Sequence, residues 1–272
     1  MKVISFNING LRARTAQLQQ LIDKHQPDVI GLQEIKVHNE AFPIEAIEAM
    51  GYKAYFHGQK AHYGVAILSK QAPTKVQYGF PTDDEDAQKR MIMATFEWQD
   101  EQGKTHAMRI LNGYFPQGEN RDHETKFPSK RKFYQDLMTY LNDHHKPSEQ
   151  LIVMGDINIS ATDADIGIGE ANAKRWLKTG KCSFLPEERE WINTLYDWGL
   201  EDSFRTLHPQ VDDKFSWFDY RSRGFDDNRG LRIDQIIVTE SLMSHCTESD
   251  VDYELRGVEK PSDHAPIWAV FK

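Results

Sequence analysis

Apolar residues along this chain fall into short runs of strand length, separated by stretches in which they recur at helical spacing. The first run, residues 3–8, is followed by a stretch of helical spacing over residues 11–25, which Pro27 closes. A second apolar run covers residues 28–33. A strand, a helix and a strand in this order predict a parallel pair of strands and hence an α/β fold.

The same pattern predicts most of a larger sheet structure. A turn-forming cluster at residues 99–103 joins two of the expected strands in a hairpin. Residues 129–145 are expected to form an amphipathic helix, and residues 161–197 a long excursion with at least one helix near residues 187–198. Further strands are expected at residues 63–69, 90–98, 105–112, 215–219, 231–239 and 265–271.

The apolar run at residues 151–154 ends abruptly in Gly155, Asp156, Ile157 and Asn158. Four consecutive large apolar residues indicate a strand buried on both faces. Gly155 permits another backbone or a ligand to approach closely, and strand alternation places Asp156 and Asn158 on one side. This stretch therefore predicts a rigidly held pair of polar side chains. The alternative is that Asp and Asn only form the turn that follows the strand.

Composition places the chain among globular proteins. With 272 residues, 39% of them hydrophobic, it can bury a sizeable core, and we expect one domain over residues 1–272. The first residues have the pattern of a strand, so we expect no secretory signal, and two cysteines are too few for a disulfide framework or a zinc site; both features favour the cytoplasm. A formal net charge of -9 argues against general attraction to polyanions, unless a divalent cation neutralises some of the carboxylates.

Polar side chains recur at the ends of the predicted strands. Packed strands can bring such ends together, and crowded carboxylates repel one another unless a cation lies among them. Oxygen ligands with one histidine and no cysteine favour Mg²⁺, with Mn²⁺ as a substitute, over zinc. Carboxylate-bound Mg²⁺ keeps positions open for water and a phosphate oxygen, as phosphoester hydrolysis requires. The residues are Asn7, Glu34, Tyr114, Asp156, Asn158, Asp234, Asp263 and His264.

Each of these residues also has a purely structural interpretation. Asn7 and Asn158 could close turns, and Tyr114 could belong to the core. His264 could be a structural histidine; because adjacent side chains usually point apart, its partner would be Asp234, which gives an oriented imidazole. The functional interpretation is favoured, because the structural one requires that polar residues stand at so many strand ends by independent coincidences.

Six short motifs, in order over essentially the whole chain, resemble the signature blocks of the exonuclease III family within the endonuclease/exonuclease/phosphatase superfamily. One departure is Ile35, where the family more often has threonine, and strand alternation should turn this side chain away from a metal. The motifs are Asn7-Ile8-Asn9-Gly10-Leu11-Arg12, Leu32-Gln33-Glu34-Ile35-Lys36, Asn112-Gly113-Tyr114-Phe115-Pro116, Gly155-Asp156-Ile157-Asn158, Arg232-Ile233-Asp234 and Ser262-Asp263-His264-Ala265-Pro266.

The resemblance implies a four-layered α/β sandwich, with two packed mixed β-sheets flanked by helices. It also implies Mg²⁺-dependent base excision repair of DNA. Members of the family degrade duplex DNA from 3′ to 5′ and release mononucleotides, cleave on the 5′ side of abasic sites, and remove 3′-phosphate and similar blocks. The expected partner is double-stranded DNA with abasic sites, nicks or blocked 3′ ends, bound by a monomer without any membrane.

Carried over to this chain, the resemblance implies a set of metal ligands. Glu34 would be the principal ligand, with Asn7 and Asp263 nearby. Asp156 and Asn158 would complete the set of oxygen-bearing residues around the ion.

The resemblance also implies catalytic roles. Asp156 would activate the attacking water while Asn158 orients the phosphate. Asp234 would hold His264, which stabilises negative charge in the transition state. Tyr114 would assist at the phosphate or at the leaving group.

Residues 215–225 interleave aromatic side chains with arginines, including Arg221, and suit a surface that stacks on sugar or base and binds phosphate. The alternative is a core strand with exposed charges. By resemblance, Trp217, Phe218 and Leu231 would line a pocket that admits a sugar without its base. Basic candidates for contacts with the DNA backbone are Lys89, Arg90, Lys174, Arg175, Lys178 and Lys181.

Two other functions are compatible with the sequence. One is a superfamily phosphodiesterase acting on phosphoinositides, sphingomyelin or RNA, against which the segment from Trp217 to Leu231 argues. The other is a catalytically inactive DNA-binding protein on the same fold, against which the full set of acidic residues with His264 argues.

Overall fold

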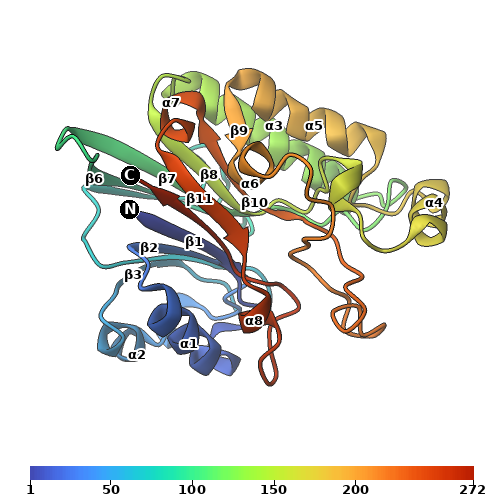
Figure 1. Ribbon diagram of the computed structural model, residues 1–272, viewed down its shortest axis with the longest axis horizontal. Helices are drawn as coiled ribbons and strands as arrows, with labels where there is room; N and C mark the ends of the chain where they lie inside the picture. Colours follow the sequence, from blue (N-terminus) through green and yellow to red (C-terminus); the bar gives the residue numbers. More distant parts are fainter.

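The computed structural model describes residues 1–272 and shows two six-stranded sheets packed together between helices (Figure 1). The strands are β1 Lys2–Asn7, β2 Val29–Gln33, β3 Lys53–His57, β4 Val65–Ser69, β5 Lys75–Tyr78, β6 Met91–Gln99, β7 Thr105–Tyr114, β8 Gln150–Asp156, β9 Leu200–Asp202, β10 Asp234–Thr239, β11 Cys246–Val251 and β12 Ile267–Phe271. The helices are α1 Thr15–His25, α2 Ile44–Ala49, α3 Lys126–His144, α4 Glu170–Thr179, α5 Pro186–Trp198, α6 Ser203–Leu207, α7 Glu240–Met243 and α8 Tyr253–Arg256. No helix combines the length and the apolar character that crossing a membrane requires.

Both sheets are mixed. One has the order β11-β12-β1-β2-β4-β3 and the other the order β5-β6-β7-β8-β10-β9. The pairs β1–β2 and β7–β8 are parallel, and each is connected through a helix, α1 and α3 respectively. The predicted strand–helix–strand opening and the β6–β7 hairpin are therefore confirmed.

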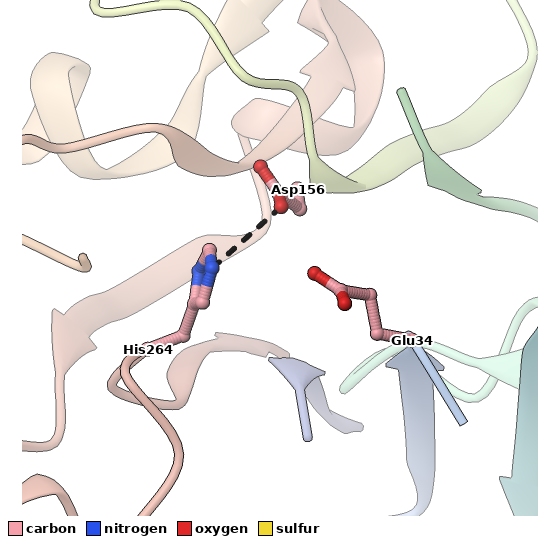
Figure 2. A group of neighbouring side chains, drawn as sticks. All are labelled: Glu34, Asp156 and His264. Atoms are coloured by element: carbon pink, nitrogen blue, oxygen red, sulfur yellow. Dashed lines mark ion pairs between the residues drawn. The ribbon is translucent and has the colours of Figure 1, made fainter. Parts of the chain in front are cut away.

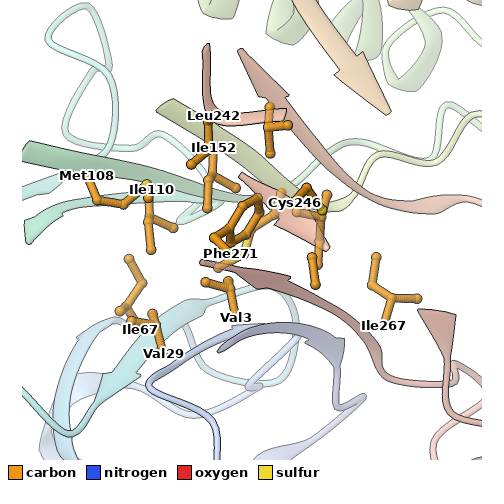
Figure 3. Packing of buried hydrophobic residues seen from close by; sticks show 14 of the residues in the cluster. Val3, Val29, Ile67, Met108, Ile110, Ile152, Leu242, Cys246, Ile267 and Phe271 are labelled. Carbon is orange, nitrogen blue, oxygen red and sulfur yellow. The ribbon is translucent and has the colours of Figure 1, made fainter. Parts of the chain in front are cut away.

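The four layers follow from strands that are apolar on both faces. In β1, Val3 faces the other sheet, whereas Ile4 packs with the cluster that includes α1. In β8, Ile152 lies between the sheets, and Val153 packs towards α3 and α5. Figure 3 shows the layer between the sheets, and Figure 1 shows α1 and α2 on one outer face with α3 and α5 on the other. The predicted four-layered sandwich is confirmed.

The end of β8 explains the glycine that precedes Asp156. Gly155 pairs with Gly113 of β7, and a Cβ built on Gly155 would lie 1.9 Å from the carbonyl oxygen of Gly113. Gly155 also has φ 141°, which favours glycine. The expected close approach is therefore made by a neighbouring backbone.

The prediction of a strand at residues 215–219 is wrong. The segment forms only isolated bridges, from Trp217 to Leu231 and to His264, together with single backbone hydrogen bonds of Ser216 and Phe218. The apolar residues of this segment anchor a loop instead, because Phe218 is fully buried against Phe225 and Tyr253. Short edge strands such as β3, β5, β9 and β11 were not predicted, because few residues in them are fully apolar.

Candidate active site

The ends of several strands from both sheets meet around one cavity of about 280 Å³. Glu34 follows β2, Tyr114 and Asp156 end β7 and β8, and His264 precedes β12. Parallel pairing within each sheet brings these ends to the same edge of the sandwich. The lining residues are Glu34, Tyr114, Gln117, Asp156, Asn158, Trp176, Lys181, Ser183, Trp217, Leu231, Ile233, Asp263 and His264.

Three side chains at the centre could hold a metal ion. Glu34, Asp156 and His264 each offer one atom, and these atoms lie within 4.8 Å of one another. Figure 2 shows the three side chains turned towards a common point from separate segments. Of the predicted site residues, Asn7 and Asp234 lie beneath this point rather than in the cavity lining.

Asn7 links the two carboxylates. Its Nδ2 donates to Glu34 Oε1 and to Asp156 Oδ2, each at 2.9 Å, while its Oδ1 accepts from the Asn9 backbone amide at 3.1 Å. This pattern turns the amide nitrogen, not the oxygen, towards the carboxylates. Asn7 therefore holds the carboxylates together and, in this arrangement, offers no oxygen to a cation.

Two candidate site residues have a left-handed backbone conformation. Glu34 has φ 49° and Asn158 has φ 55°, both in the left-handed region that non-glycine residues rarely adopt. The predicted alternation along an extended chain therefore does not apply to Asn158, because β8 ends at Asp156. Nevertheless both residues face the cavity. Ile35 is buried in the core, away from the cavity, as predicted.

Asp234 and His264 form a buried pair. His264 Nδ1 donates to Asp234 Oδ2 at 2.8 Å, and His264 Nε2 lies 3.7 Å from Asp156 Oδ2. The amide of Asp234 donates to the hydroxyl of Ser216 at 3.0 Å, which fixes the start of β10. Burial alone would lower the pKa of His264, but the neighbouring carboxylates of Asp234 and Asp156 outweigh it and raise the pKa.

The donor set fits a divalent cation. Burial raises the pKa of Asp156 above its usual range, and the carboxylates of Asp234 and Glu34 raise it further against the opposing effect of His264. Four carboxyl groups, those of Glu34, Asp156, Asp234 and Asp263, lie near two cationic side chains, those of His264 and Lys36. Carboxylate oxygens without any thiolate are the ligands that Mg²⁺ prefers, so the residues present suit a magnesium ion.

Tyr114 is held by an arginine. The guanidinium of Arg90 packs on the rings of Tyr63 and Tyr114, 4.2 and 4.8 Å from their ring centres, and Arg90 Nη1 donates to the Tyr114 carbonyl oxygen at 3.0 Å. Burial raises the pKa of Tyr114, and the carboxylates of Glu34 and Asp156 raise it further, so Tyr114 remains a hydrogen-bond donor. Arg90 is itself 9% exposed and supports Tyr114 from behind.

Asp263 lines the cavity, and each of its two oxygens accepts a hydrogen bond. Asn9 Nδ2 donates to Oδ1 at 2.8 Å and Trp217 Nε1 donates to Oδ2 at 3.2 Å. Lys36 Nζ lies 3.1 Å from Glu34 Oε2. Sequence reasoning missed Asn9 and Lys36 as site residues, although both stand inside the motifs that carry the resemblance.

A second cavity of about 370 Å³ adjoins the first and shares Trp176, Lys181 and Trp217 with it. Arg175, Arg221 and Arg229 also line it, so three predicted basic contacts, Arg175, Lys181 and Arg221, gather beside the site. Lys181 Nζ lies 3.9 Å from the ring centre of Trp176. Sequence reasoning did not identify Trp176 as a site residue, because Trp176 stands on α4 among polar residues.

The other predicted DNA contacts do not line these two cavities. Phe218 is fully buried and does not line the pocket as expected, because its ring belongs to the anchor of the loop. Lys174 is exposed and pairs with Glu170, and Lys178 is exposed on the same helix. Lys89 Nζ donates to the carbonyl oxygen of Glu85 at 3.1 Å.

Comparisons with known proteins agree with this geometry. The model of the Endonuclease/Exonuclease/phosphatase family matches residues 4–264. The chain is 63% identical over 272 residues to an exodeoxyribonuclease III from Haemophilus influenzae, covering 100% of both proteins. It is 29% identical to an exodeoxyribonuclease from Bacillus subtilis, covering 98% of both.

Solved structures with the same fold include relatives of stated activity. A 3′ phosphatase, NExo from Neisseria, bound to product DNA hairpin, matches with a TM-score of 0.89 and 35% identity, over 100% of this chain and 99% of that chain. An AP endonuclease from Archaeoglobus fulgidus matches with a TM-score of 0.88 and 30% identity, over 100% of this chain and 99% of that chain. The chain therefore belongs to the endonuclease/exonuclease/phosphatase family and, within it, to the exodeoxyribonuclease III group of DNA repair nucleases.

Proposed function

We propose that this chain hydrolyses phosphodiester and phosphomonoester bonds of double-stranded DNA with Mg²⁺, at abasic sites, at nicks and at blocked 3′ ends. The observation that carries the proposal is the convergence of Glu34, Asp156 and His264 within 4.8 Å at the edge of the sandwich. These side chains come from three distant parts of the sequence, and two of them are buried. We further expect the chain to act as a monomer in the cytoplasm, in keeping with its two free, buried cysteines.

Glu34 and Asp156 would hold the Mg²⁺ ion, and Mn²⁺ is expected to substitute. When bound, the cation supplies electrostatic stabilisation of charge on the phosphate oxygens. Asn7 keeps the two carboxylates at a fixed separation through its two hydrogen bonds. Asp263, whose oxygens accept from Asn9 and Trp217, would lie beside the ion and add to the oxygen-bearing side chains around it.

The remaining polar residues would act on water and phosphate. Asp156 accepts the proton of the attacking water. His264, oriented through its Nδ1 by Asp234, presents Nε2 to the charge that develops on the phosphorus-bound oxygens. Asn158 orients the phosphate with its carboxamide, and Tyr114 donates its phenolic hydrogen to the phosphate or to the leaving oxygen.

The cavity walls support a DNA substrate over a small phosphoester. Trp217, Leu231 and Trp176 provide apolar and aromatic surface suited to a sugar that lacks its base. Arg221 and Lys181 in the adjoining cavity suit the backbone phosphates, so a local basic surface offsets the net charge of -9. The relative from Neisseria, which is bound to a product DNA hairpin, further supports this substrate class.

The direct test is incubation of the protein with three substrates: an abasic duplex, a duplex with a 3′-phosphate, and bis(4-nitrophenyl) phosphate. Each is incubated with Mg²⁺ and with EDTA. We expect both duplexes to be processed with Mg²⁺ only, and the small diester to be hydrolysed poorly. Preference for the small diester would favour a superfamily phosphodiesterase with another substrate. Absence of cleavage under all conditions, with binding of the duplex retained, would favour an inactive DNA-binding relative.

A further inference from the structure

A fully buried lysine lies directly behind the cavity. Lys130 of α3 has no exposed surface, and its Nζ lies 2.8 Å from the carbonyl oxygen of Asn158, 3.2 Å from that of Gln117 and 2.5 Å from Glu188 Oε1. An ammonium group carries three hydrogens, so these three acceptors satisfy it completely. A Cβ built on Gly118 would lie 3.0 Å from Lys130 Cδ, which shows how closely the stem of the lysine is packed.

The two carbonyl groups belong to the two segments that shape the cavity floor. Gln117 follows β7 and Asn158 follows β8, and both side chains line the cavity. Asn158 has φ 55°, in the left-handed region, which asparagine tolerates better than most non-glycine residues do, so a contact that fixes its carbonyl group selects this conformation among those open to the residue. Lys130 supplies such a restraint, and Tyr134 of the same helix adds a second by donating to the Ile157 carbonyl oxygen at 2.7 Å.

Stability alone does not account for this ion pair. Glu188 of α5 is also fully buried, and its Oε2 accepts from the backbone amide of Leu185 at 2.8 Å. Taking two charges out of water costs several kcal/mol for each ion, and apolar pairs of similar volume are often as stable as buried ion pairs. The contribution that an apolar pair could not replace is the donation of hydrogen bonds to Gln117 and Asn158.

We infer that Lys130 is a positioning residue of the catalytic site: it fixes the backbone of Asn158 and Gln117, and Glu188 serves to neutralise it. This inference rests on the proposed function, because Asn158 is assigned there to the phosphate. It predicts that removing the ammonium lowers kcat even in a protein that is fully folded. Removing the carboxylate of Glu188 alone leaves the hydrogen bonds from Lys130 to the carbonyl groups of Asn158 and Gln117 in place. This change should therefore lower mainly the stability of the fold.

The experiment compares Lys130→Met with Glu188→Gln on an abasic duplex with Mg²⁺, well below the melting temperature, together with the Tm of each variant. Both should lower the Tm, because each leaves a buried partner uncompensated. We expect Lys130→Met to lower kcat by about 10- to 100-fold, with a smaller effect on KM, as for a misplaced catalytic group. Glu188→Gln should keep kcat close to the wild-type value.

The double variant Lys130→Met/Glu188→Met separates positioning from stability. It removes the lone buried charge but not the need of the two carbonyl groups for a donor, so its Tm should lie above that of Lys130→Met while kcat stays low. The control is Lys132→Met on the same helix, whose ammonium is exposed and pairs with Asp136, and which should change neither quantity.

Recovery of kcat together with Tm in the double variant would overturn the inference. So would equal losses of kcat in Lys130→Met and Glu188→Gln at equal Tm. An inactive wild-type protein would instead refute the proposed function. An active wild type with an equally active Lys130→Met variant would refute only the role of Lys130.

Discussion

His264 and Asp234 are joined by a hydrogen bond of 2.8 Å in a region that excludes solvent, and they lie 30 positions apart in the chain. Asp234 begins β10, whereas His264 precedes β12 in the other sheet. The pair therefore bridges the two sheets at the edge where the cavity lies. An imidazole held in this way keeps its Nε2 directed at Asp156 instead of turning about χ2.

Exchange of Asp234 for Asn should uncouple this pair. The Asp234→Asn variant should lose about 10²-fold or more in kcat, because an amide does not fix the imidazole in the same protonated form. His264→Asn should lose a similar factor, and the double variant should be no worse than the poorer single one. Single-turnover rates on an abasic duplex check this prediction, and fully additive losses would show that the two residues act separately.

Asp156→Asn should leave the fold intact and remove nearly all hydrolysis of every substrate. A lost general base typically costs about 10²- to 10⁴-fold in rate. The protein should remain folded at the assay temperature because the side chain keeps its size, although one of the two donors that Asp156 accepts from, Asn7 Nδ2 or the Asn158 amide, loses its acceptor. Asp143→Asn, an exposed position on α3, is the matched control. Rates like those of the wild type in Asp156→Asn would refute the assigned role.

Trp217→Ala should harm cleavage at abasic sites more than removal of a 3′-phosphate, because the ring lines the part of the cavity that suits a baseless sugar. The ring also donates through Nε1 to Asp263, so Trp217→Phe is needed beside it. If the aromatic surface matters most, phenylalanine preserves most of the abasic-site activity. Equal losses on both substrates in Trp217→Ala would indicate a structural role.

Mg²⁺ should raise the Tm of the wild-type protein in a saturable manner, since a ligand that binds only the folded state stabilises it by about 2.7 kcal/mol at 100 times its Kd. Glu34→Gln should abolish most of this shift, because the carboxylate that faces the cavity is lost. Glu97→Gln, on the exposed side of β6, should retain the shift. A shift that survives in Glu34→Gln would place the binding site elsewhere.

Asp252 makes stability depend on pH. Burial alone would raise the pKa of this carboxyl group, but hydrogen bonds from His25, the Leu255 amide and Lys24 outweigh it and hold the pKa well below its ordinary value. A lowered pKa stabilises the fold above the unfolded-state pKa of about 4, and this contribution is lost as the pH falls towards the folded-state pKa.

Asp252→Asn should therefore be less stable than the wild type by roughly 1–3 kcal/mol at pH 7, and the difference should shrink at pH 3. Urea unfolding at pH 7, 5 and 3 measures this difference. The control is Glu254→Gln, which removes the exposed second partner of Lys24 and should change stability by less than about 0.5 kcal/mol. A difference that grows below pH 4 would contradict the assignment.

The sequence alone determined those features that depend on neighbours in the chain. Runs of apolar residues at strand length predicted the buried strands, including β8, since a strand that is apolar on both faces needs a layer on each side. Polar residues at the strand ends predicted an oxygen-rich site, because a sandwich gathers strand ends at its edge. The sequence also predicted that another backbone or a ligand approaches Gly155 closely, because glycine has no side chain to prevent it.

Only the tertiary structure decided which side chain meets which. Phe218 looked like a lining residue but anchors a loop, and Arg90, which was expected to contact DNA, packs on the rings of Tyr63 and Tyr114. Lys130 stood among the basic residues of an amphipathic helix, with nothing to show that Glu188, 58 positions later, would neutralise it in the interior. Such pairings depend on how distant segments pack, because the free energy of a buried charge is set by partners that local patterns do not reveal.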